Sequence, residues 1–482
     1  MDDKIRLRRR PARCGAGAFL LRVAARAARS AGSKKGSTAV FLVMILSAIL
    51  LLASTLIGAA GLAAGKSYGD LVFRMAGRSL LSEYDRKLCA DYGLFAMRSD
   101  EEQAARKLTH YSDASLKNGG RAGAVWLLPC KTADLRVYLS DFSLMDVDAF
   151  EKQVLKDIKF ITVNKLADAL RPASPTAPAG GGDAGATEPR TINNQTVLNG
   201  LPSKGMGGGG PSPLSMLASG LPSAGELFSG GTDAFFVSEY IMARFAHAYA
   251  PVPNLAAGHT RFFQYETEYI LVGGHGDEDN LKGVESRLRV LRFALNEIHV
   301  HNDGELTAAV NGLVASLCAA FPGLPAPLVR ELIYAVWVAL ETENDLKLLR
   351  AGEKVALIKA HGNWAVGIEE VPKIVVAYLT STSEAQDGAA DIGESSEDAA
   401  RRLGMVRPSD RNGFSYGDYL RLFLFFTSRE NKLLRSMDLI QINMKTGYYE
   451  AFLLREHYVG LRYELTMNGD RYRYRQSYDA AE

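Results

Sequence analysis

The chain has 482 residues, of which 47% are hydrophobic and 23% are charged, and these values are typical of folded globular domains. Its length is enough for about two or three domains with a sizeable core. Four cysteines do not make a disulfide framework in a chain of this length, and no Cys-x-x-Cys spacing indicates a metal site (Cys14, Cys89, Cys130 and Cys318). A Cys89–Cys130 disulfide and buried free thiols remain as alternatives.

The formal net charge of +2 hides a basic segment at residues 1–36. Only Asp2 and Asp3 are acidic there, whereas eleven residues before Gly36 are basic (Lys4, Arg6, Arg8, Arg9, Arg10, Arg13, Arg22, Arg26, Arg29, Lys34 and Lys35). Such a block is typical of a nucleic-acid tail, a targeting signal or the cytoplasmic flank of a membrane helix. The residues that follow favour the membrane flank, so no nucleic-acid partner is expected.

An uncharged stretch runs from Gly36 to Gly65. It exceeds the about 20 apolar residues that a helix needs to cross a bilayer and the about 7–15 residues of a cleaved signal peptide. We therefore predict a single transmembrane helix at 37–64, with a buried helix of a soluble domain as the alternative. By the positive-inside rule, residues 1–36 are a cytoplasmic tail or leader. The protein is then expected in the cytoplasmic membrane, with the lipid bilayer as a partner and the large domain extracytoplasmic, at the cell surface.

Residues 65–170 are expected to form a helical rod and the first part of an outer domain. After Lys66, apolar residues at three- and four-residue spacings predict that the membrane helix continues outward as far as Phe95 (Val72, Met75, Leu80, Tyr84, Leu88 and Tyr92). Replacing Leu80 and Leu88 on this face is expected to abolish assembly without altering membrane insertion. The pattern then predicts helices at 100–116 and 148–170 and a strand at 135–144.

Residues 171–230 are rich in Gly and Pro. Such a stretch buries too little apolar surface to offset its chain entropy, so it is expected to be a flexible linker. Residues 231–482 form the second part of the outer domain. Their periodicity predicts an acidic loop at 382–400, strands at 262–272 and 449–465, and helices at 235–249, 280–299, 304–321, 325–350, 415–426 and 431–445. The predicted fold class is α+β and helix-predominant, with one transmembrane helix, an extracytoplasmic rod and a mixed α/β outer domain.

Two short patterns carry residue types that do chemistry. Glu266 and Glu268 lie on one side of the predicted strand, where paired carboxylates can act as acid and base, although a half-exposed strand explains the same alternation. His299 and His301 form a His-x-His pair, with Asp303 and Glu305 nearby as further ligands. Histidines at a helix C-terminus also interact well with the last carbonyls, without any metal.

Other patterns are weaker. The segment 272–280 lies between a predicted strand and a helix, as a phosphate loop does, but it lacks the required glycine and lysine spacing and carries three acids, which favours a capped turn. Basic and aromatic residues at 462–478 suit either contact with a polyanion or a solvated terminal strand. No serine-elbow or Cys/His signature occurs. We therefore predict no enzymatic activity and name no cofactor, metal or catalytic residue.

Several segments carry a family resemblance, among them Asp91-Tyr-Gly-Leu-Phe95 and the residues at 36–42, 76–88, 150–155, 265–270, 337–349, 416–422 and 437–443. They resemble a family of uncharacterised bacterial proteins, mainly from Gram-positive lineages, that is associated with tight-adherence (Tad) type IV pilus systems. The resemblance implies a surface component of a pilus or secretion apparatus, with protein partners from that assembly. It implies no catalytic residues.

The N-terminus is also similar to TadE/TadG-like pseudopilins, in which a peptidase cuts a basic leader after a glycine. This similarity implies a leader-processing site between Gly36 and Ser37. Phe41 stands where pilins usually carry Glu, five residues after the cut, and an uncharged helix is easier to hold in lipid. We therefore expect a permanently anchored, pseudopilin-like or accessory subunit that acts by protein–protein interaction. A membrane-tethered cell-envelope enzyme or ligand receptor is the alternative.

Overall fold

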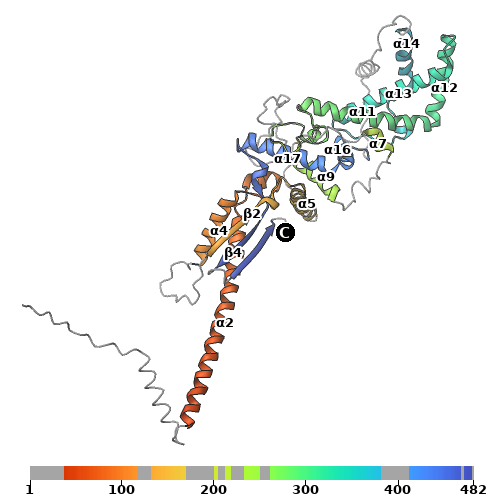
Figure 1. Ribbon diagram of the computed structural model, residues 1–482. Coiled ribbons are helices and arrows are strands. Elements are labelled where there is room, and N and C mark those ends of the chain that lie inside the picture. The colour runs from red at the N-terminus through yellow and green to blue at the C-terminus, as the bar shows by residue number, and fades with distance from the viewer. Residues whose placement is uncertain are drawn as a thin grey trace, which may run out of the picture. The chain divides into compact units, whose positions relative to one another are not determined.

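The computed structural model describes residues 37–116, 132–169, 200–204, 212–218, 233–249, 261–381, 412–467 and 472–479. Helices predominate and the strands are few and short (Figure 1), which confirms the predicted helix-predominant fold. Internal contacts divide the chain into two compact units. The first unit comprises Met1–Ala76, Thr109–Leu135 and Leu465–Tyr474, and the second comprises Gly77–Leu108, Arg136–Glu464 and Arg475–Glu482.

α2 (Ser37–Leu81) is one continuous helix of 45 residues. It contains the predicted membrane segment and runs on past it, as the apolar spacing predicts. It ends at Leu81, however, so the prediction of a single rod as far as Phe95 is wrong. The chain turns at Ser82, whose backbone N–H donates to the carbonyl of Arg78 at 3.0 Å.

A local capping signal explains why a new helix begins soon after this turn. The side chain of Asp85 accepts hydrogen bonds from the backbone N–H groups of Lys87 at 2.8 Å and Leu88 at 3.1 Å, and so caps α3 (Arg86–Tyr92). α3 ends at Gly93, whose φ of 68° is a conformation that glycine adopts without strain.

In the first unit, Tyr474 packs against the outward part of α2. Its hydroxyl donates to the carbonyl of Lys66 at 3.0 Å, and its ring centroid lies 5.6 Å from that of Phe73. Gly69 permits this approach, because a Cβ at that position would lie 2.5 Å from the Tyr474 hydroxyl. Tyr68 of α2 also donates to the carbonyl of Ser115, near the end of α4 (Glu101–Leu116).

The described strands form two sheets. β1 (Met97–Arg98) pairs antiparallel with β3 (His457–Tyr458). β2 (Thr132–Tyr138), β4 (Gly460–Met467) and β5 (Tyr472–Asp479) form the other sheet, in the order β2-β4-β5. The strand predicted at 135–144 therefore ends early, in the 3-10 helix η1 (Ser140–Phe142), and the strands predicted from residue 449 begin only after η4 (Leu454–Glu456).

Most of the second unit is helical, and local capping signals set several of its boundaries. Ser415 and Asp418 form a capping box at the start of α16, and Asp303 caps α12. The 3-10 helices η2 (His361–Asn363) and η3 (Ile368–Glu370) precede α14. In chain order the α-helices are α5 (Val147–Ala169), α7 (Pro213–Ala218), α9 (Asp233–Arg244), α10 (Glu266–Val272), α11 (Asp277–Asn302), α12 (Gly304–Ala320), α13 (Ala326–Arg350), α14 (Val371–Ser381), α16 (Tyr416–Phe426) and α17 (Arg429–Gly447).

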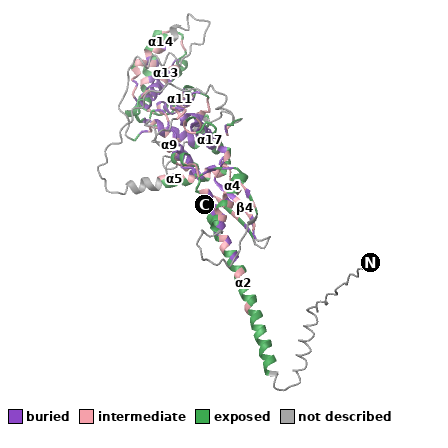
Figure 2. Ribbon diagram, turned by 90° about the vertical axis from the view of Figure 1, so that its left-hand side faces the viewer, coloured by how far each residue is buried: buried purple, intermediate pink, exposed green. Residues whose placement is uncertain are grey.

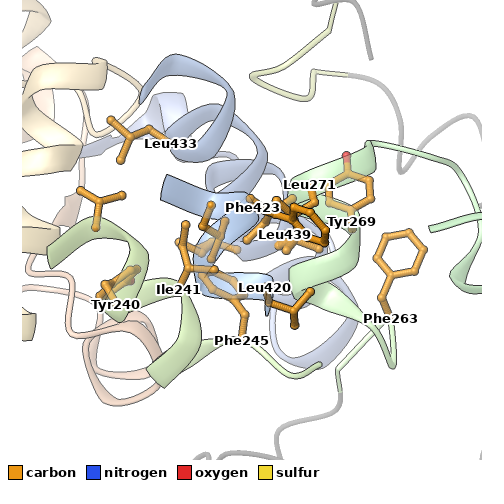
Figure 3. Close-up of a cluster of buried hydrophobic side chains, with 14 of the residues drawn as sticks. Tyr240, Ile241, Phe245, Phe263, Tyr269, Leu271, Leu420, Phe423, Leu433 and Leu439 are labelled. Carbon is orange, nitrogen blue, oxygen red and sulfur yellow. The ribbon is translucent and has the colours of Figure 1, made fainter. Parts of the chain in front are cut away.

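Two groups of buried apolar side chains hold these helices together. In the larger group, Figure 3 shows Ile241, Phe245 and Leu420 close together between α9 and α16, with side chains of α10 and α17 beside them. The smaller group lies among α12, α13 and α14 around Trp337, whose indole N–H donates to the carbonyl of Val366 at 2.8 Å. Figure 2 shows buried residues concentrated in the helices of the second unit and exposed residues along α2.

The strand predicted at 262–272 is wrong, because Glu266–Val272 form the helix α10. Every residue from Glu266 to Leu271 is buried, so the polar–apolar alternation does not mark a wet face and a dry face. Both acids point into the protein, where other segments of the chain donate hydrogen bonds to them. The prediction placed both acids on a solvent-exposed face. Hydrogen-bond donors from distant segments of the chain allow them to be buried instead.

Part of the predicted linker is built into the second unit. Leu201 belongs to the larger core, and the backbone N–H of Ser203 donates to Asp438 at 3.0 Å. The side chain of Gln441 donates to the carbonyl of Gly200 at 2.9 Å, and α7 packs against α11. The interpretation as a flexible linker is therefore wrong for 200–204 and for α7. The rest of 171–230, the basic segment 1–36 and the acidic loop 382–400 lie outside the described residues.

Candidate functional sites

α2 is the one helix among the described residues that is long and apolar enough to cross a membrane, by length and composition. Its large apolar side chains are exposed along the predicted membrane segment; Leu51 is 69% exposed and Ile57 is 73% exposed. Exposed apolar surface on this scale is unfavourable in water and suits a lipid environment. The candidate leader-processing site lies at the start of this helix: Ser37 is the first residue of α2, and Gly36 lies outside the described residues.

Glu266 is fully buried and joins three segments of the chain. Its carboxylate accepts hydrogen bonds from the backbone N–H of Ala246 at 2.8 Å and from the side chain of Asn443 at 2.5 Å, and it pairs with Arg261. Asn443 also binds Tyr92, through an Nδ2–Oη distance of 2.9 Å. A carboxylate with these partners stabilises the packing of α10 against α17 and the loop after α9, and is not free for acid–base chemistry.

Glu268, two residues on, is buried to the same degree but has a different environment. Its Oε1 accepts hydrogen bonds from the backbone N–H of Ala248 and from the hydroxyl of Tyr416, both at 2.9 Å. Its Oε2 is buried and has no hydrogen-bond partner among the described residues. Burial without a paired cation raises the pKa of Glu268 to about 7, and the negative charge of Asp277 adds to the effect. Glu268 is thus a proton-binding group inside the domain.

A strained tyrosine lies beside this carboxyl. Tyr249 has a φ of 59°, in the left-handed region that costs a bulky side chain about 1–3 kcal/mol. Its ring meets that of Tyr416 edge to face at 5.0 Å, and its hydroxyl donates to Glu285 at 2.8 Å. Burial opposes ionisation of Glu285, but hydrogen bonds from Arg350 and Tyr249 outweigh it and lower the pKa of Glu285. Glu268 and its surroundings therefore form a polar centre made by α10, α11, α13, α16 and the loop after α9.

The structure does not bring the histidine pair to this centre. His299 lies near Trp364, with ring centroids 5.6 Å apart, and its Nε2 is 3.9 Å from Asp303. The ring of His301 lies tilted against that of Tyr334, with the centroids 4.2 Å apart. No cluster of three or more metal-binding side chains occurs in the part of the chain that the structure describes. Both histidines are therefore accounted for by aromatic packing at the end of α11.

The segment 272–280 is a tight turn between α10 and α11, as the sequence favours. Gly273 ends α10 with a φ of 79°, and Asn280 binds back to Gly274 through both its oxygen and its nitrogen. Asp277 is buried and accepts hydrogen bonds from the backbone N–H groups of Gln264 and Tyr265 at 3.1 Å. Asp277 thus holds the preceding loop in place.

A buried charge network among the described residues was not predicted from the sequence. Arg292 of α11 and Asp345 of α13 are both at most 1% exposed, and their side chains meet at 2.8 Å. Arg292 also donates to the carbonyls of Ala356 and Leu357, both at 2.9 Å. Lys359 in the same loop pairs with Asp345 at 2.6 Å and with Glu341. The network fastens the loop after α13 onto α11 and α13.

A sequence signal for this network exists in retrospect. The apolar run of α13 is followed at once by Glu341, Glu343 and Asp345, and α11 carries Arg292 between Leu291 and Phe293. Charges placed on the apolar face of an otherwise buried helix indicate an internal ion pair. Only the packing of α11 against α13 shows which of these charges pair with one another.

Lys432 and the described cysteines are the remaining candidate side chains. Lys432 of α17 is 2% exposed and donates to the hydroxyl of Ser238 at 3.3 Å, and burial lowers its pKa to about 8. Cys89 and Cys318 form no disulfide with another described residue. Cys130 lies outside the described residues, so the Cys89–Cys130 disulfide stays untested.

The protein thus belongs to the class of helix-predominant proteins that carry one long apolar N-terminal helix and have polar groups buried in the folded domain. The chain belongs to the family of unknown function (DUF5702), whose model matches residues 188–469. The match covers most helices of the second unit and excludes α2. Among curated proteins and among solved structures, nothing matches the chain.

Proposed function

We propose that the protein is a membrane-anchored surface component of a Tad-like pilus or secretion apparatus, and that it acts by protein–protein interaction. The observation that carries the proposal is the uncharged, exposed stretch of α2, which continues without interruption toward a folded domain. A helix of this kind suits a single membrane anchor with a domain held beyond it. The link to Tad systems is supported by the family-like segments of the sequence alone.

The proposed orientation has the basic segment 1–36 in the cytoplasm and the domain on the extracytoplasmic side. Phe41 is 66% exposed on α2 and leaves the segment free of charge, which favours a permanent anchor over incorporation into a filament. We propose that the leader is retained, so that Gly36 and Ser37 stay joined.

Leu80 and Leu88, the rod residues expected to be needed for assembly, are not the residues that we propose for partner contact. Leu80 and Leu88 are fully buried, so they support the fold and are not available for docking. Leu71 is 54% exposed and Met75 is 58% exposed, on the part of α2 that lies beyond the predicted membrane segment. We propose that these two exposed side chains contact a partner subunit.

Topology is tested first, on intact cells. Protease added outside is expected to digest the domain and leave a membrane-retained fragment that contains the basic segment. A full-length chain that resists protease until the cells are opened would place the domain inside and refute the orientation. The mass of the N-terminal peptide of the same sample tests the leader, because a chain that starts at Ser37 would contradict permanent anchoring.

Partner contact is tested with a photo-crosslinking residue at position 71 and, as the matched control, at position 80. We expect position 71 to give adducts with identified pilus or secretion subunits in strains that carry a Tad-like system. Position 80 is buried and is expected to give intramolecular products only. Equal adduct patterns at both positions, or adducts that persist when the Tad-like genes are deleted, would contradict the proposal.

The alternative function is a cell-envelope ligand receptor. The polar centre at Glu268 favours it, because a strained Tyr249 beside a buried carboxyl of raised pKa is an arrangement found at functional sites. The other candidate groups, Glu266, His299 and His301, do not converge on this centre, so an enzymatic role has less support. A non-enzymatic role remains the prediction.

A further inference from the structure

Lys359 is a buried amine enclosed by two buried carboxyl groups. Its side chain is 3% exposed, and its Nζ donates to Oε1 of Glu341 and lies 2.6 Å from Oδ1 of Asp345. Glu341 and Asp345 are four residues apart in α13, so their side chains leave the same face of the helix. They are 0% and 1% exposed. The three groups are therefore held together, out of contact with water.

The two oxygens of Asp345 have different surroundings. Oδ2 accepts hydrogen bonds from Arg292, through Nε at 3.1 Å and Nη2 at 2.8 Å, and from Asn296 Nδ2 at 2.9 Å. Oδ1 faces Lys359, but this close contact lacks the angles of a hydrogen bond. Donors gathered on one oxygen stabilise negative charge there, as in an oxyanion hole. The carbon of this carboxyl is thereby polarised next to an amine.

Glu341 is placed to carry protons between them. Its oxygens accept hydrogen bonds from the backbone N–H groups of Val366 at 2.8 Å and Ala365 at 3.0 Å, which fix the carboxyl against Lys359. The ring of Trp364 lies 5.6 Å from the Lys359 Nζ and is 4% exposed.

We propose that Lys359 and Asp345 are joined by an intramolecular isopeptide bond between Nζ and Cγ. The ammonium of Lys359 gives a proton to Glu341, and the neutral amine attacks Cγ of Asp345. Arg292 and Asn296 hold the charge that develops on Oδ2. The Cγ–Oδ1 bond then breaks as Oδ1 takes two protons, one from Glu341 and one from the nitrogen by way of Glu341, and leaves as water.

The atoms balance without any added reagent. One ammonium and one carboxylate give one amide and one water, with no oxidant, reductant or activated group. The bond ties the loop after α13 back to α13 at the place where Arg292 also binds that loop. It needs no oxidising compartment, unlike a disulfide.

Peptide mass spectrometry of the full chain, purified from membranes and denatured, tests the proposal. Trypsin cuts after Arg330, Lys347, Lys354 and Lys373, so the bond is expected to yield peptide 331–347 joined to peptide 355–373. The branched product should weigh one water less than the two peptides together, with no cleavage after Lys359. Fragment ions should place the branch at Asp345.

Two variants and one internal control complete the design. Lys359→Arg keeps a cation and removes the amine, and Glu341→Gln keeps the size and removes the proton acceptor; both are expected to give linear peptides only. Lys432, which is buried but has the Ser238 hydroxyl as its partner, should be cleaved normally in the same digest.

Linear peptides with cleavage after Lys359, from wild-type protein whose circular dichroism shows a folded helical domain, would overturn the proposal. A branch that maps to Glu341 in place of Asp345 would also overturn the proposal. A bond that forms fully in the Glu341→Gln variant would remove Glu341 from the mechanism.

Discussion

Glu268 is expected to make the stability of the folded protein depend on pH. Burial raises its pKa from 4.5 to about 7 in the folded state, whereas the unfolded chain exposes the carboxyl to water. The folded state therefore binds the proton more tightly, and the resulting stabilisation is complete below about pH 4.5 and is lost as the pH rises through about 7. Each pH unit in this window removes about 1.4 kcal/mol, so crossing it lowers the free energy of unfolding by about 3 kcal/mol.

The matched variant is Glu268→Gln, which resembles the neutral acid at every pH. Its amide oxygen still accepts from the backbone N–H of Ala248 and the hydroxyl of Tyr416. At about pH 5 the two proteins should differ by less than about 1 kcal/mol. At about pH 8 the variant should be more stable by about 2–3 kcal/mol, because the wild type then buries a charge.

Urea unfolding of the full chain in detergent measures this difference, with the helical circular dichroism as the signal. The comparison with Glu268→Gln removes the contribution of other titrating groups, such as Asp438, whose pKa burial also raises. A difference in the free energy of unfolding that stays constant across the pH window would show that Glu268 is ionised in the folded protein. Burial of Glu268, with Oε2 lacking a hydrogen-bond partner, would then not raise the pKa of this carboxyl.

Five further substitutions test the packing by the same unfolding assay. Leu80→Ala should lower the free energy of unfolding by about 2–5 kcal/mol because the side chain is fully buried, whereas Leu71→Ala, at a position 54% exposed, should change it by less than about 0.5 kcal/mol. Gly93→Ala should cost more than about 1 kcal/mol, because φ is 68° and the new Cβ would collide with a neighbouring carboxylate. Gly312→Ala in α12 should instead gain about 0.5–1 kcal/mol, since a Cβ there meets nothing within 4 Å. Arg292→Met should lower the free energy of unfolding by about 1–3 kcal/mol, because it removes two donors from the buried Oδ2 of Asp345.

Each of these predictions has an outcome that contradicts it. Similar losses for Leu80→Ala and Leu71→Ala would mean that burial along α2 does not set the cost. A stabilising Gly93→Ala would mean that α3 ends in another backbone conformation. A near-neutral Arg292→Met would mean that water or another donor reaches Oδ2 of Asp345.

The elements with long, regular apolar spacing were predictable from sequence. The membrane stretch of α2 and the helices α4, α5, α11, α12, α13, α16 and α17 lie close to their predicted ranges. Their signals are local, since spacing, capping residues and the absence of charge act within a few turns of one helix. The turn at 272–280 was recognised for the same reason.

The candidate site was only partly predictable. Glu266 and Glu268 were singled out, but as one face of a strand, and their separate roles depend on Asn443, Arg261 and Tyr416, which lie far away in the sequence. Lys359 gives no sequence signal at all. Its chemistry arises from two carboxylates in α13.

Local pattern therefore decided which segments are helical, that one of them is apolar enough to cross a membrane, and where several helices begin. The folded chain decided which charged side chains are buried and with what partners. The physical reason is that burial and pairing of charge depend on segments distant in sequence: Arg292 and Asp345 are 53 residues apart, and Glu268 and Tyr416 are 148 residues apart. A single sequence shows the charges, and only tertiary packing brings them within hydrogen-bond distance.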